Sequence, residues 1–470
     1  MANKTIADII YDARNGGATG EAAVLAALSN ALPDVNGPTF AAIGDSMTDQ
    51  NTRWILPPLA SPSSAWFSDG PLSWFRILSH QRINFPLSHE LGVSGDTFEQ
   101  ILARVDQVFN LSPKPDYCVV LAGANNISLT TSLGSFESMR DKWLKIVTSI
   151  KERGIIPITM PAPPRAGSTL TTAQVLTQHR LTAFQREFCR KNKGYLFCDY
   201  LKYFIDQASA TGAPLALMVK ADNLHPAATG AFYMGKAMAE LMDMYLPDPA
   251  SSFFSAMDYY DATSNPTGSL LHSGATNYST MAGTTGTHTA SSGFTTSGNL
   301  ATGFTSIKSG GTSTMAATCS KESRTDGWAS GALQVVAISV TGAGGADEIH
   351  NLRATPVFAD VAPGDWVYAE VKVDVTGAPV NLNALELYLL ESRPSNSQTA
   401  VDMNYNAATS LLVPAVTWSG TLRTPPIQIQ SNSTALQVNL RSRFNTTSGT
   451  AGITYKATDY VVRKVDPTLI

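Results

Sequence analysis

Short apolar runs alternate with amphipathic segments through the first half of the chain. The runs end in small or polar residues, as strands buried on both faces of a sheet do, and they cover residues 39–46, 117–126, 155–164 and 195–200. Amphipathic helices are predicted between and after them, at residues 98–109, 138–154, 179–192 and 229–246. Strands that alternate with helices predict an α/β domain whose parallel sheet is covered on both faces. Ligands of such sheets bind beyond the carboxyl ends of the strands.

The second half of the chain follows a different pattern. Ser, Thr and Gly dominate residues 263–318 and charge nearly vanishes there, a composition typical of a flexible linker. Apolar residues nevertheless recur in this segment, among them Tyr278, Phe294 and Phe304, so we expect short strands and loops. After residue 328, runs with period-two alternation, clearest at residues 367–373, are separated by turn residues. Several such strands in one block predict an all-β sandwich of jelly-roll-like arrangement.

A chain of 470 residues is too long for one ordinary core, and three parts are expected. Residues 1–36 are predicted to form an N-terminal helical leader, residues 37–248 the α/β domain, and residues 249–470 the β-sandwich domain, in which 263–318 is the Ser/Thr/Gly-rich first segment. The leader has one apolar face. A helix packed on the α/β domain and an attachment or oligomerisation segment both remain open for it.

Composition and charge exclude several classes of protein. Hydrophobic residues make up 43% of the chain and charged residues 15%, as is typical of globular domains. The net charge of −4 provides no basic surface, so no nucleic-acid partner is expected. The four cysteines form no CxxC pair, which predicts buried free thiols. Because the seven histidines form no cluster with cysteines, no metal site is expected.

Neither a membrane span nor a signal peptide is predicted. No stretch reaches the roughly 18 apolar residues that a transmembrane helix needs. Lys4, Asp8 and Asp12 interrupt the apolar positions near the first residue, so the core of a signal peptide does not form. We therefore expect a soluble protein that is synthesised in the cytosol.

The strongest candidate for chemistry is Ser46, in the segment Gly44-Asp45-Ser46-Met47-Thr48-Asp49 at the carboxyl end of the first predicted strand. A serine there, followed by a helix, lies near backbone N–H donors and near the positive end of the helix dipole. The segment is not the GxSxG elbow of the α/β-hydrolases. Asp-Ser is also a common helix N-cap, so the motif alone leaves both interpretations open.

A candidate base and its partner occur together in Asp222-Asn223-Leu224-His225-Pro226, just before the last predicted helix of the α/β domain. A nucleophilic serine needs a base, and the base needs a partner that fixes its tautomer and stabilises the imidazolium. A three-residue spacing in a turn lets Asp222 reach one ring nitrogen of His225 while the other nitrogen faces Ser46. The alternative is a turn that begins the helix, with His225 at the surface.

Two further segments offer donors for an oxyanion. Gly95, in Gly92-Val93-Ser94-Gly95-Asp96-Thr97, can present a backbone N–H with no side chain in the way. Asn125, in Gly123-Ala124-Asn125-Asn126, can present its side-chain amide at the end of a strand. Acyl transfer builds an oxyanion that requires such donors, but Gly and Asn are also ordinary turn residues.

Together the segments GDSMTD, GVSGDT, GANN and DNLH resemble the four sequence blocks of the SGNH (GDSL-type) hydrolase family, across residues about 39–246. The resemblance implies a three-layer flavodoxin-like fold, no cofactor, and a serine esterase whose catalytic and oxyanion-hole residues are Ser46, His225, Asp222, Gly95 and Asn125. In this scheme Ser46 is the nucleophile and also donates its N–H, His225 is the base and Asp222 its partner. The third block departs from the family pattern, because Asn126 stands where the family usually has a mostly structural aspartate.

The expected substrate is a short acyl ester, most simply an O-acetyl group on a carbohydrate or polysaccharide. The aromatic residues that follow Ser46 either stack on sugar rings or pack the core; they are Trp54, Trp66, Phe67, Trp74 and Phe75. Arg165 and the segment 51–53 are candidates for a polar cleft, and Trp328, Trp366 and Trp418 are candidate glycan platforms in the sandwich.

The combination of the two domains also resembles esterase modules of phage tail proteins, which deacetylate bacterial surface glycans and are often trimers. A virion-associated homo-oligomer released by lysis is therefore expected as one setting. Two other functions remain open: a lipid or short-chain aliphatic esterase or thioesterase, and a glycan-binding structural tail protein without activity.

Overall fold

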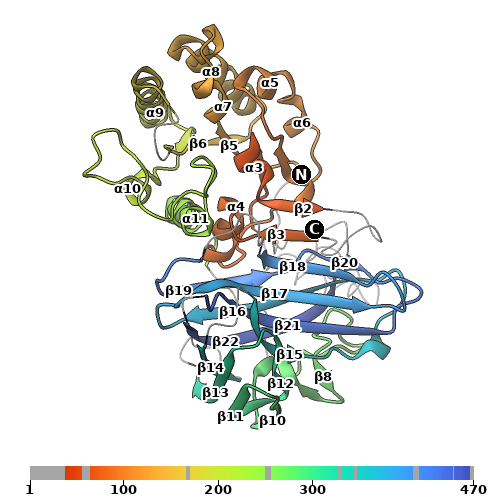
Figure 1. Cartoon of the computed structure of the whole chain (residues 1–470). Coiled ribbons are helices and arrows are strands. Elements are labelled where there is room, and N and C mark those ends of the chain that lie inside the picture. Colours follow the sequence, from red (N-terminus) through yellow and green to blue (C-terminus); the bar gives the residue numbers. More distant parts are fainter. Residues whose placement is uncertain are drawn as a thin grey trace, which may run out of the picture.

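The computed structural model of the chain describes residues 37–54, 64–165, 170–248, 256–324, 331–342, 347–405, 412–447 and 449–465 (Figure 1). The predicted helical leader at residues 1–36 lies outside the described residues. An α/β domain stands on a β-sandwich, and the described chain crosses between them more than once.

A five-stranded parallel sheet forms the centre of the α/β domain. Its strands, in spatial order, are β4 (Glu90–Gly92), β1 (Phe40–Gly44), β5 (Tyr117–Ala122), β6 (Ile156–Pro161) and β7 (Leu196–Phe197). All residues of β1 are buried, as expected for a strand covered on both faces. Counted along the chain, the order is 2-1-3-4-5, which is the flavodoxin-like order. The strand order therefore reverses between β1 and β5, where such sheets bind their ligands.

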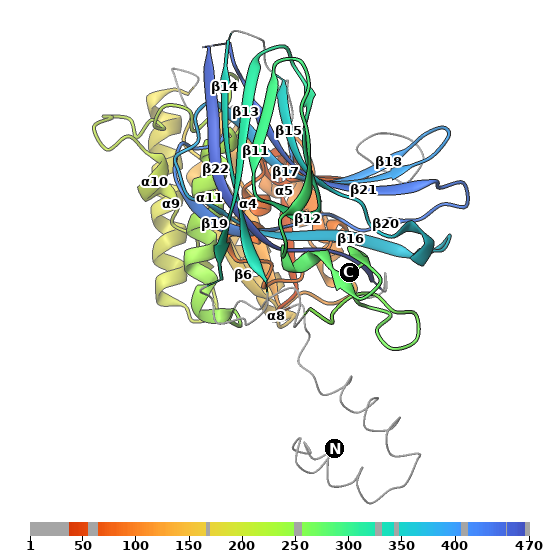
Figure 2. The ribbon, with the colours of Figure 1, turned by 90° about the horizontal axis from the view of Figure 1, so that it is seen from below.

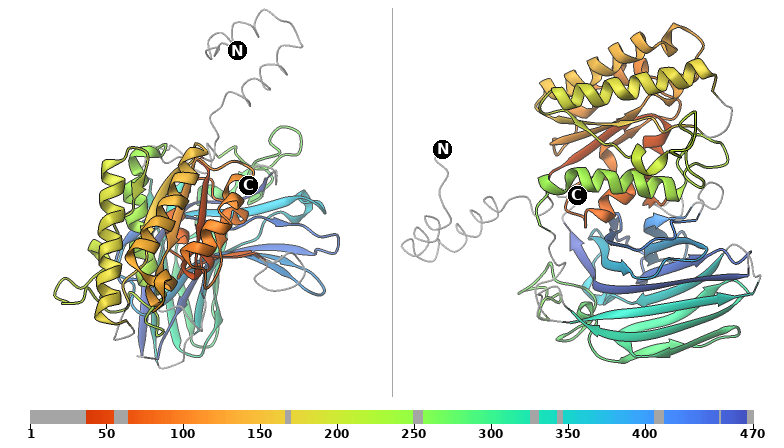
Figure 3. Two further views of the ribbon diagram at one scale, coloured as in Figure 1. Left: turned by 90° about the horizontal axis from the view of Figure 1, so that it is seen from above. Right: turned by 90° about the vertical axis from the view of Figure 1, so that its left-hand side faces the viewer.

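Helices cover both faces of this sheet and give three layers (Figure 3). One face carries α5 (Phe98–Ala103), α8 (Phe136–Glu152) and α9 (Thr172–Lys191), and the other carries α4 (Pro71–Leu78) and α11 (Ala228–Met242). Shorter helices are α3 (Ser46–Asp49), α6 (Asp106–Phe109), α7 (Ala124–Ser128) and α10 (Leu201–Phe204). The single helix predicted over residues 98–109 is two helices, α5 and α6, with a break after Ala103.

The sandwich consists of two large sheets (Figure 2). One sheet has the order β10 (Thr285–Thr289), β12 (Leu300–Gly310), β15 (Glu348–Ala354), β21 (Ala435–Phe444), β17 (Leu382–Ser392), β18 (Gln398–Asn404), β3 (Ser64–Phe67) and β2 (Thr52–Trp54). The other has the order β11 (Phe294–Gly298), β13 (Thr314–Ser323), β14 (Ala332–Thr341), β22 (Thr450–Val465), β16 (Trp366–Val375) and β19 (Trp418–Arg423), and β20 (Ile427–Gln428) pairs with β16. A separate pair is β8 (His272–Ser273) with β9 (Thr276–Asn277).

The predicted fold class, an α/β domain with a parallel sheet followed by an all-β sandwich, is confirmed. The Ser/Thr/Gly-rich segment forms strands, and its Phe294 and Phe304 are buried in the sandwich core. All four cysteines are buried and free, as predicted. Among the helices in the described parts of the chain, none combines the length and the apolar character that crossing a bilayer requires.

The two domains share one core and one sheet. β3, which lies between Ser46 and α4 in the sequence, pairs in parallel with β18 of the sandwich, and β2 pairs with β3. The buried ring of Trp74 in α4 meets Phe232 of α11 at 5.0 Å and Trp418 of β19 at 5.4 Å between ring centroids, both edge to face. Trp418 therefore packs the interface between the domains and offers no platform to a glycan.

A buried arginine links the domains beside this aromatic contact. The guanidinium of Arg76, in α4, donates a hydrogen bond to Asp402 of β18 at 3.3 Å and lies 4.2 Å from the ring centroid of Trp66. The side chains of Arg76 and Asp402 are 6% and 0% exposed. A charge pair this deeply buried leaves a costly unpaired charge when one partner is removed.

We expect Arg76→Met to lower the free energy of unfolding by about 3–5 kcal/mol, because the carboxylate of Asp402 would stay buried without its partner. Arg82→Met is the matched control on the same segment: its partner Asp243 is 71% exposed, so a loss of at most about 1 kcal/mol is expected from that pair. Urea unfolding followed by tryptophan fluorescence measures both. Equal losses in the two variants would contradict the assignment of Arg76 to the interface.

Candidate active site

Ser46 lies at the end of β1, in a turn that only a small residue permits. A Cβ on Gly44 would lie 2.1 Å from the carbonyl oxygen of Leu121 and 2.1 Å from the hydroxyl of Thr48, so the strand end needs glycine. Asp45 caps α3 by accepting a hydrogen bond from the N–H of Met47 at 3.1 Å. Burial raises the pKa of Asp45 to about 7, although backbone N–H groups oppose the shift. Around neutral pH this carboxyl group therefore carries only part of a negative charge beside Ser46.

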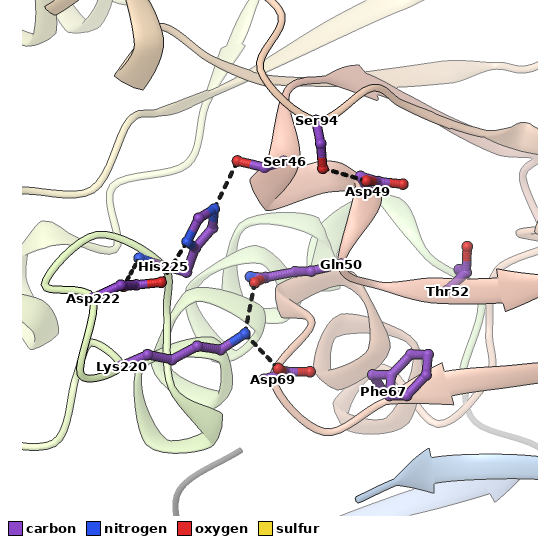
Figure 4. Close-up of a pocket in the computed structure, with 10 residues that line it drawn as sticks. All are labelled: Ser46, Asp49, Gln50, Thr52, Phe67, Asp69, Ser94, Lys220, Asp222 and His225. Carbon is purple, nitrogen blue, oxygen red and sulfur yellow. Dashed lines mark hydrogen bonds and ion pairs between the residues drawn. The ribbon is translucent and has the colours of Figure 1, made fainter. Parts of the chain in front are cut away.

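The structure brings Ser46, His225 and Asp222 together in one hydrogen-bonded chain (Figure 4). Nε2 of His225 is 2.7 Å from the hydroxyl oxygen of Ser46, and Nδ1 is 2.7 Å from Oδ2 of Asp222. The other carboxylate oxygen, Oδ1, accepts the N–H groups of Leu224 at 2.9 Å and His225 at 3.0 Å. Burial acts to raise the pKa of Asp222, but these hydrogen bonds lower it below its usual value. The carboxylate is thus held ionised and fixes the orientation of the imidazole ring.

The two predicted oxyanion donors lie on the neighbouring strand ends. Gly95, in the exposed loop after β4, has φ +90°, and Asn125 follows β5. The side-chain amide of Asn125 donates one hydrogen bond, at 2.9 Å, to the carbonyl oxygen of Asp96, the residue after Gly95. Since that NH2 group has two hydrogens, one remains for a ligand. Within the described part of the chain, neither the Ser46 N–H nor the Gly95 N–H donates to a protein acceptor.

Arg104 fixes the loop that carries Gly95. Its guanidinium donates to Asp96 at 2.7 Å, to the carbonyl of Leu91 at 2.8 Å and to the carbonyl of Gly44 at 2.8 Å. The arginine therefore ties the loop to the ends of β4 and β1. The sequence gives no local signal for this role, because the three acceptors lie on three separate segments.

Asn126 has a structural role that an aspartate could not fill in the same way. Its carbonyl oxygen accepts the N–H of Phe98 at 2.8 Å, and its NH2 group donates to Glu99 at 2.9 Å and to the carbonyl of Leu133 at 3.1 Å. An ionised aspartate has no hydrogens for these two acceptors. The departure from the family pattern thus stabilises the start of α5.

A cleft of about 390 Å³ opens beside Ser46, and Figure 4 shows the side chains that line it: Ser46, Asp49, Gln50, Thr52, Phe67, Asp69, Ser94, Lys220, Asp222 and His225. Phe67 is the one aromatic side chain among these residues, and the others are polar or charged. The hydroxyl of Ser94 donates to Asp49. Gly95 and Asn125 are not part of the lining, but Ser94, the residue before Gly95, is.

Several sequence candidates lie elsewhere. Trp66, Trp74 and Phe75 are buried core residues, so of the described aromatic candidates only Phe67 reaches the cleft. The side chain of Trp54 and all of Trp328 lie outside the described residues, and Trp366 is half-buried. Arg165 donates to the carbonyl of Ala124 at 2.9 Å and to the hydroxyl of Ser128 and does not line the cleft. Of residues 51–53, Thr52 lines the cleft and Asn51 is buried.

The sequence did not predict that five other residues line the cleft: Asp49, Gln50, Asp69, Ser94 and Lys220. Asp49 and Ser94 lie inside the motifs around Ser46 and Gly95. Their polar side chains beside the candidate catalytic residues are a sequence signal for a place in the site. Asp69 and Lys220 have no such signal. No group of three His, Cys, Asp or Glu side chains suited to a metal ion occurs within the described ranges.

Comparisons with known proteins find one matching family and several similar solved structures. The sequence profile of the GDSL-like lipase/acylhydrolase family matches residues 42–231. A GDSL-like lipase from Bacteroides thetaiotaomicron is 19% identical over 51% of this chain and 98% of its own, with a TM-score of 0.30. A catalytic mutant of an acetylxylan esterase from Geobacillus stearothermophilus is 15% identical over 45% of this chain and 96% of its own, with a TM-score of 0.33. Curated proteins give no match.

The matched segment begins inside β1 and ends inside α11, so it contains every strand of the parallel sheet and all five site residues predicted from the sequence. The β-sandwich follows it almost entirely. The α/β domain therefore carries the match to the GDSL-like lipase/acylhydrolase family, and the predicted SGNH hydrolase domain with an appended β-sandwich is confirmed.

Proposed function

We propose that the protein is a serine esterase that hydrolyses short acyl esters through an acyl-enzyme on Ser46. The observation that carries this proposal is the unbroken chain from the Ser46 hydroxyl through both nitrogens of His225 to Asp222, with 2.7 Å at each contact of the ring. A hydroxyl group becomes nucleophilic when an adjacent base can take its proton as it attacks.

The reaction follows from this geometry. The Ser46 oxygen attacks the ester carbonyl carbon while Nε2 of His225 takes the hydroxyl proton. The bond from that carbon to the alcohol oxygen then breaks, and His225 gives its proton to the leaving alcohol. Water attacks the acyl-enzyme with His225 again as base, which releases the carboxylic acid and restores the serine. Asp222 stays ionised and stabilises the imidazolium in both steps.

The negative charge that develops on the carbonyl oxygen needs donors that are already in place. The N–H groups of Ser46 and Gly95 and the free N–H of Asn125 are the donors we assign to it. Removal of one such donor typically slows turnover by roughly 10²–10³-fold. The bracing of this loop by Arg104 supports the assignment, because fixed donors need no reorganisation during the reaction.

The lining of the cleft favours a polar alcohol. His225 must reach the oxygen of the leaving group, and its side chain lines the cleft, so we assign the cleft to the alcohol part of the ester. Hydroxyl, amide and charged groups line it beside the single ring of Phe67, a set suited to a sugar. We therefore propose an O-acetylated carbohydrate as the substrate. The phage-tail setting, the trimer and glycan binding by the sandwich stay predictions from the sequence.

A lipid or long-chain thioester is the second candidate, and its acyl chain would need an apolar groove. Of the described residues that line the cleft, only Phe67 is apolar. The cleft therefore does not provide that groove, and it suits a polar alcohol better than a lipid.

We expect Ser46→Ala to lower the turnover of p-nitrophenyl acetate by about 10⁴–10⁶-fold, because the triad then has no nucleophile. Ser88→Ala is the control, since it removes an exposed hydroxyl of the same domain that does not line the cleft and should leave the turnover unchanged. Circular dichroism of both variants should match that of the parent protein. Substantial turnover by Ser46→Ala would refute the assignment of the nucleophile.

We expect turnover to fall steeply from acetyl to octanoyl esters of p-nitrophenol, because the proposed substrate carries an O-acetyl group and the site must then favour the shortest acyl chain. Acetate release from acetylated polysaccharides, plant xylans beside bacterial surface glycans, then tests the alcohol. Faster hydrolysis of octanoyl than of acetyl esters would overturn the carbohydrate proposal and favour a lipid substrate, while leaving the nucleophile assignment intact.

A further inference from the structure

One cleft residue, Lys220, connects three segments that are far apart in the sequence (Figure 4). Its ammonium nitrogen is 2.6 Å from Oδ2 of Asp69 and 3.1 Å from Oε1 of Gln50. The side chains of Lys220 and Asp69 are 11% and 3% exposed. Desolvating two charges is costly, and an ion pair in such a place holds only with close geometry. The contact therefore fixes the relative positions of the segments that it joins.

The first segment is the turn that carries Asp222 and His225. The backbone N–H of Lys220 donates to the carbonyl of His225 at 2.8 Å, and the N–H of Asn223 donates to the carbonyl of Lys220 at 2.9 Å. Lys220 and His225 are thus directly hydrogen-bonded across one closed turn. Holding the lysine side chain in place also holds the base in place.

The second segment is the helix of the nucleophile. Gln50 follows α3, and its backbone N–H donates to the carbonyl of Ser46 at 3.1 Å. A single side chain therefore bridges the helix of Ser46 and the turn of His225, whose side chains meet at 2.7 Å.

The third segment belongs to the sheet shared with the sandwich. Asp69 lies in the turn between β3 and α4, and the N–H of the preceding residue, Ser68, donates to the carbonyl of Asn404 in β18 at 3.2 Å. The carboxylate that holds Lys220 is thereby anchored to the sandwich. The appended domain takes part in fixing the geometry of the site.

We propose that Lys220, held by Asp69, is a positioning residue that keeps His225 within hydrogen-bonding distance of Ser46. This proposal rests on the esterase function proposed above. A displacement of a catalytic group by about 1 Å can cost roughly 10²-fold in rate. With p-nitrophenyl acetate, which has no sugar for the charged groups of the cleft to bind, loss of the bridge should therefore lower kcat without a comparable change in KM, because Lys220 then acts only through His225.

The test uses the double variant Lys220→Met/Asp69→Asn in the full chain, since either single substitution would remove one charge of a buried ion pair and keep the other. Its thermal midpoint should stay close to that of the parent. For p-nitrophenyl acetate, kcat should fall by roughly 10–10²-fold while KM stays nearly unchanged. The control Lys308→Met/Glu348→Gln removes a comparable pair of the sandwich, 3.1 Å long and 6% and 0% exposed, and should keep the parent kcat.

Chemical rescue separates positioning from mere structural damage. Alkylation of a Lys220→Cys variant with 2-bromoethylamine joins an aminoethyl group to the new thiolate with loss of bromide, and it rebuilds a side chain of the length and charge of lysine. All four native cysteines are buried, whereas residue 220 lines the cleft, so the reagent reaches the introduced thiol through the cleft. The treatment should restore most of kcat, whereas treatment of Lys220→Met should restore none.

A parent-like kcat in the Lys220→Met/Asp69→Asn variant would overturn the proposal. A rise in KM with unchanged kcat would overturn it too, because it would make Lys220 a residue that binds substrate. If the parent protein hydrolyses no ester at all, the proposed esterase function fails. If the parent is active and the double variant is equally active, only the positioning role of Lys220 fails.

Discussion

The site depends on the two hydrogen bonds of the His225 ring. They join a serine and an aspartate whose segments lie 179 and 3 residues away from the histidine in the sequence. The contact with Asp222 is local, whereas the contact with Ser46 depends on the fold. A parallel sheet brings the carboxyl ends of its strands to one edge, and Ser46 lies at that edge. The order 2-1-3-4-5 places the ends of β4, β1 and β5 side by side, and these ends carry the loop of Gly95, the turn of Ser46 and the segment of Asn125. The strand order thus arranges nucleophile and oxyanion donors, and the turn before α11 supplies the base.

The β-sandwich is more than an appended module in this protein. It takes two strands from the α/β domain into its own sheet, and it shares a core with α4 and α11 through Trp74 and Trp418. Thr52 in β2, Phe67 in β3 and Asp69 after β3 also line the cleft. The pairing of β2 and β3 with the sandwich therefore contributes both to the interface between the domains and to the lining of the cleft. This continuity explains why a residue of the catalytic turn, Lys220, is fixed by a carboxylate anchored beside the sandwich.

Sequence patterns predicted the fold class and the five site residues. Ser46, Gly95 and Asn125 lie in short motifs at strand ends, and Asp222 and His225 lie in one short motif before a helix. The patterns did not predict β2 and β3, since strands of three and four residues leave too few positions for alternation to be visible. The partner strand β18 lies more than 300 residues later in the sequence, so no local pattern indicates the pairing. Arg104 and Lys220 were missed for the same reason: their roles come from acceptors on separate segments. Trp74 and Trp418 were visible as aromatic residues, but only the three-dimensional packing decides between core and platform.

The central claim is that Ser46 alone is activated, and by His225. Intact-protein and peptide mass spectrometry after treatment with a fluorophosphonate measures this directly, because such reagents form a covalent bond with a serine whose hydroxyl has a functioning base. The account predicts one adduct per chain, located on Ser46, and no adduct in a His225→Ala variant that keeps its fold. An adduct on another serine, or undiminished labelling of Ser46 without His225, would contradict it.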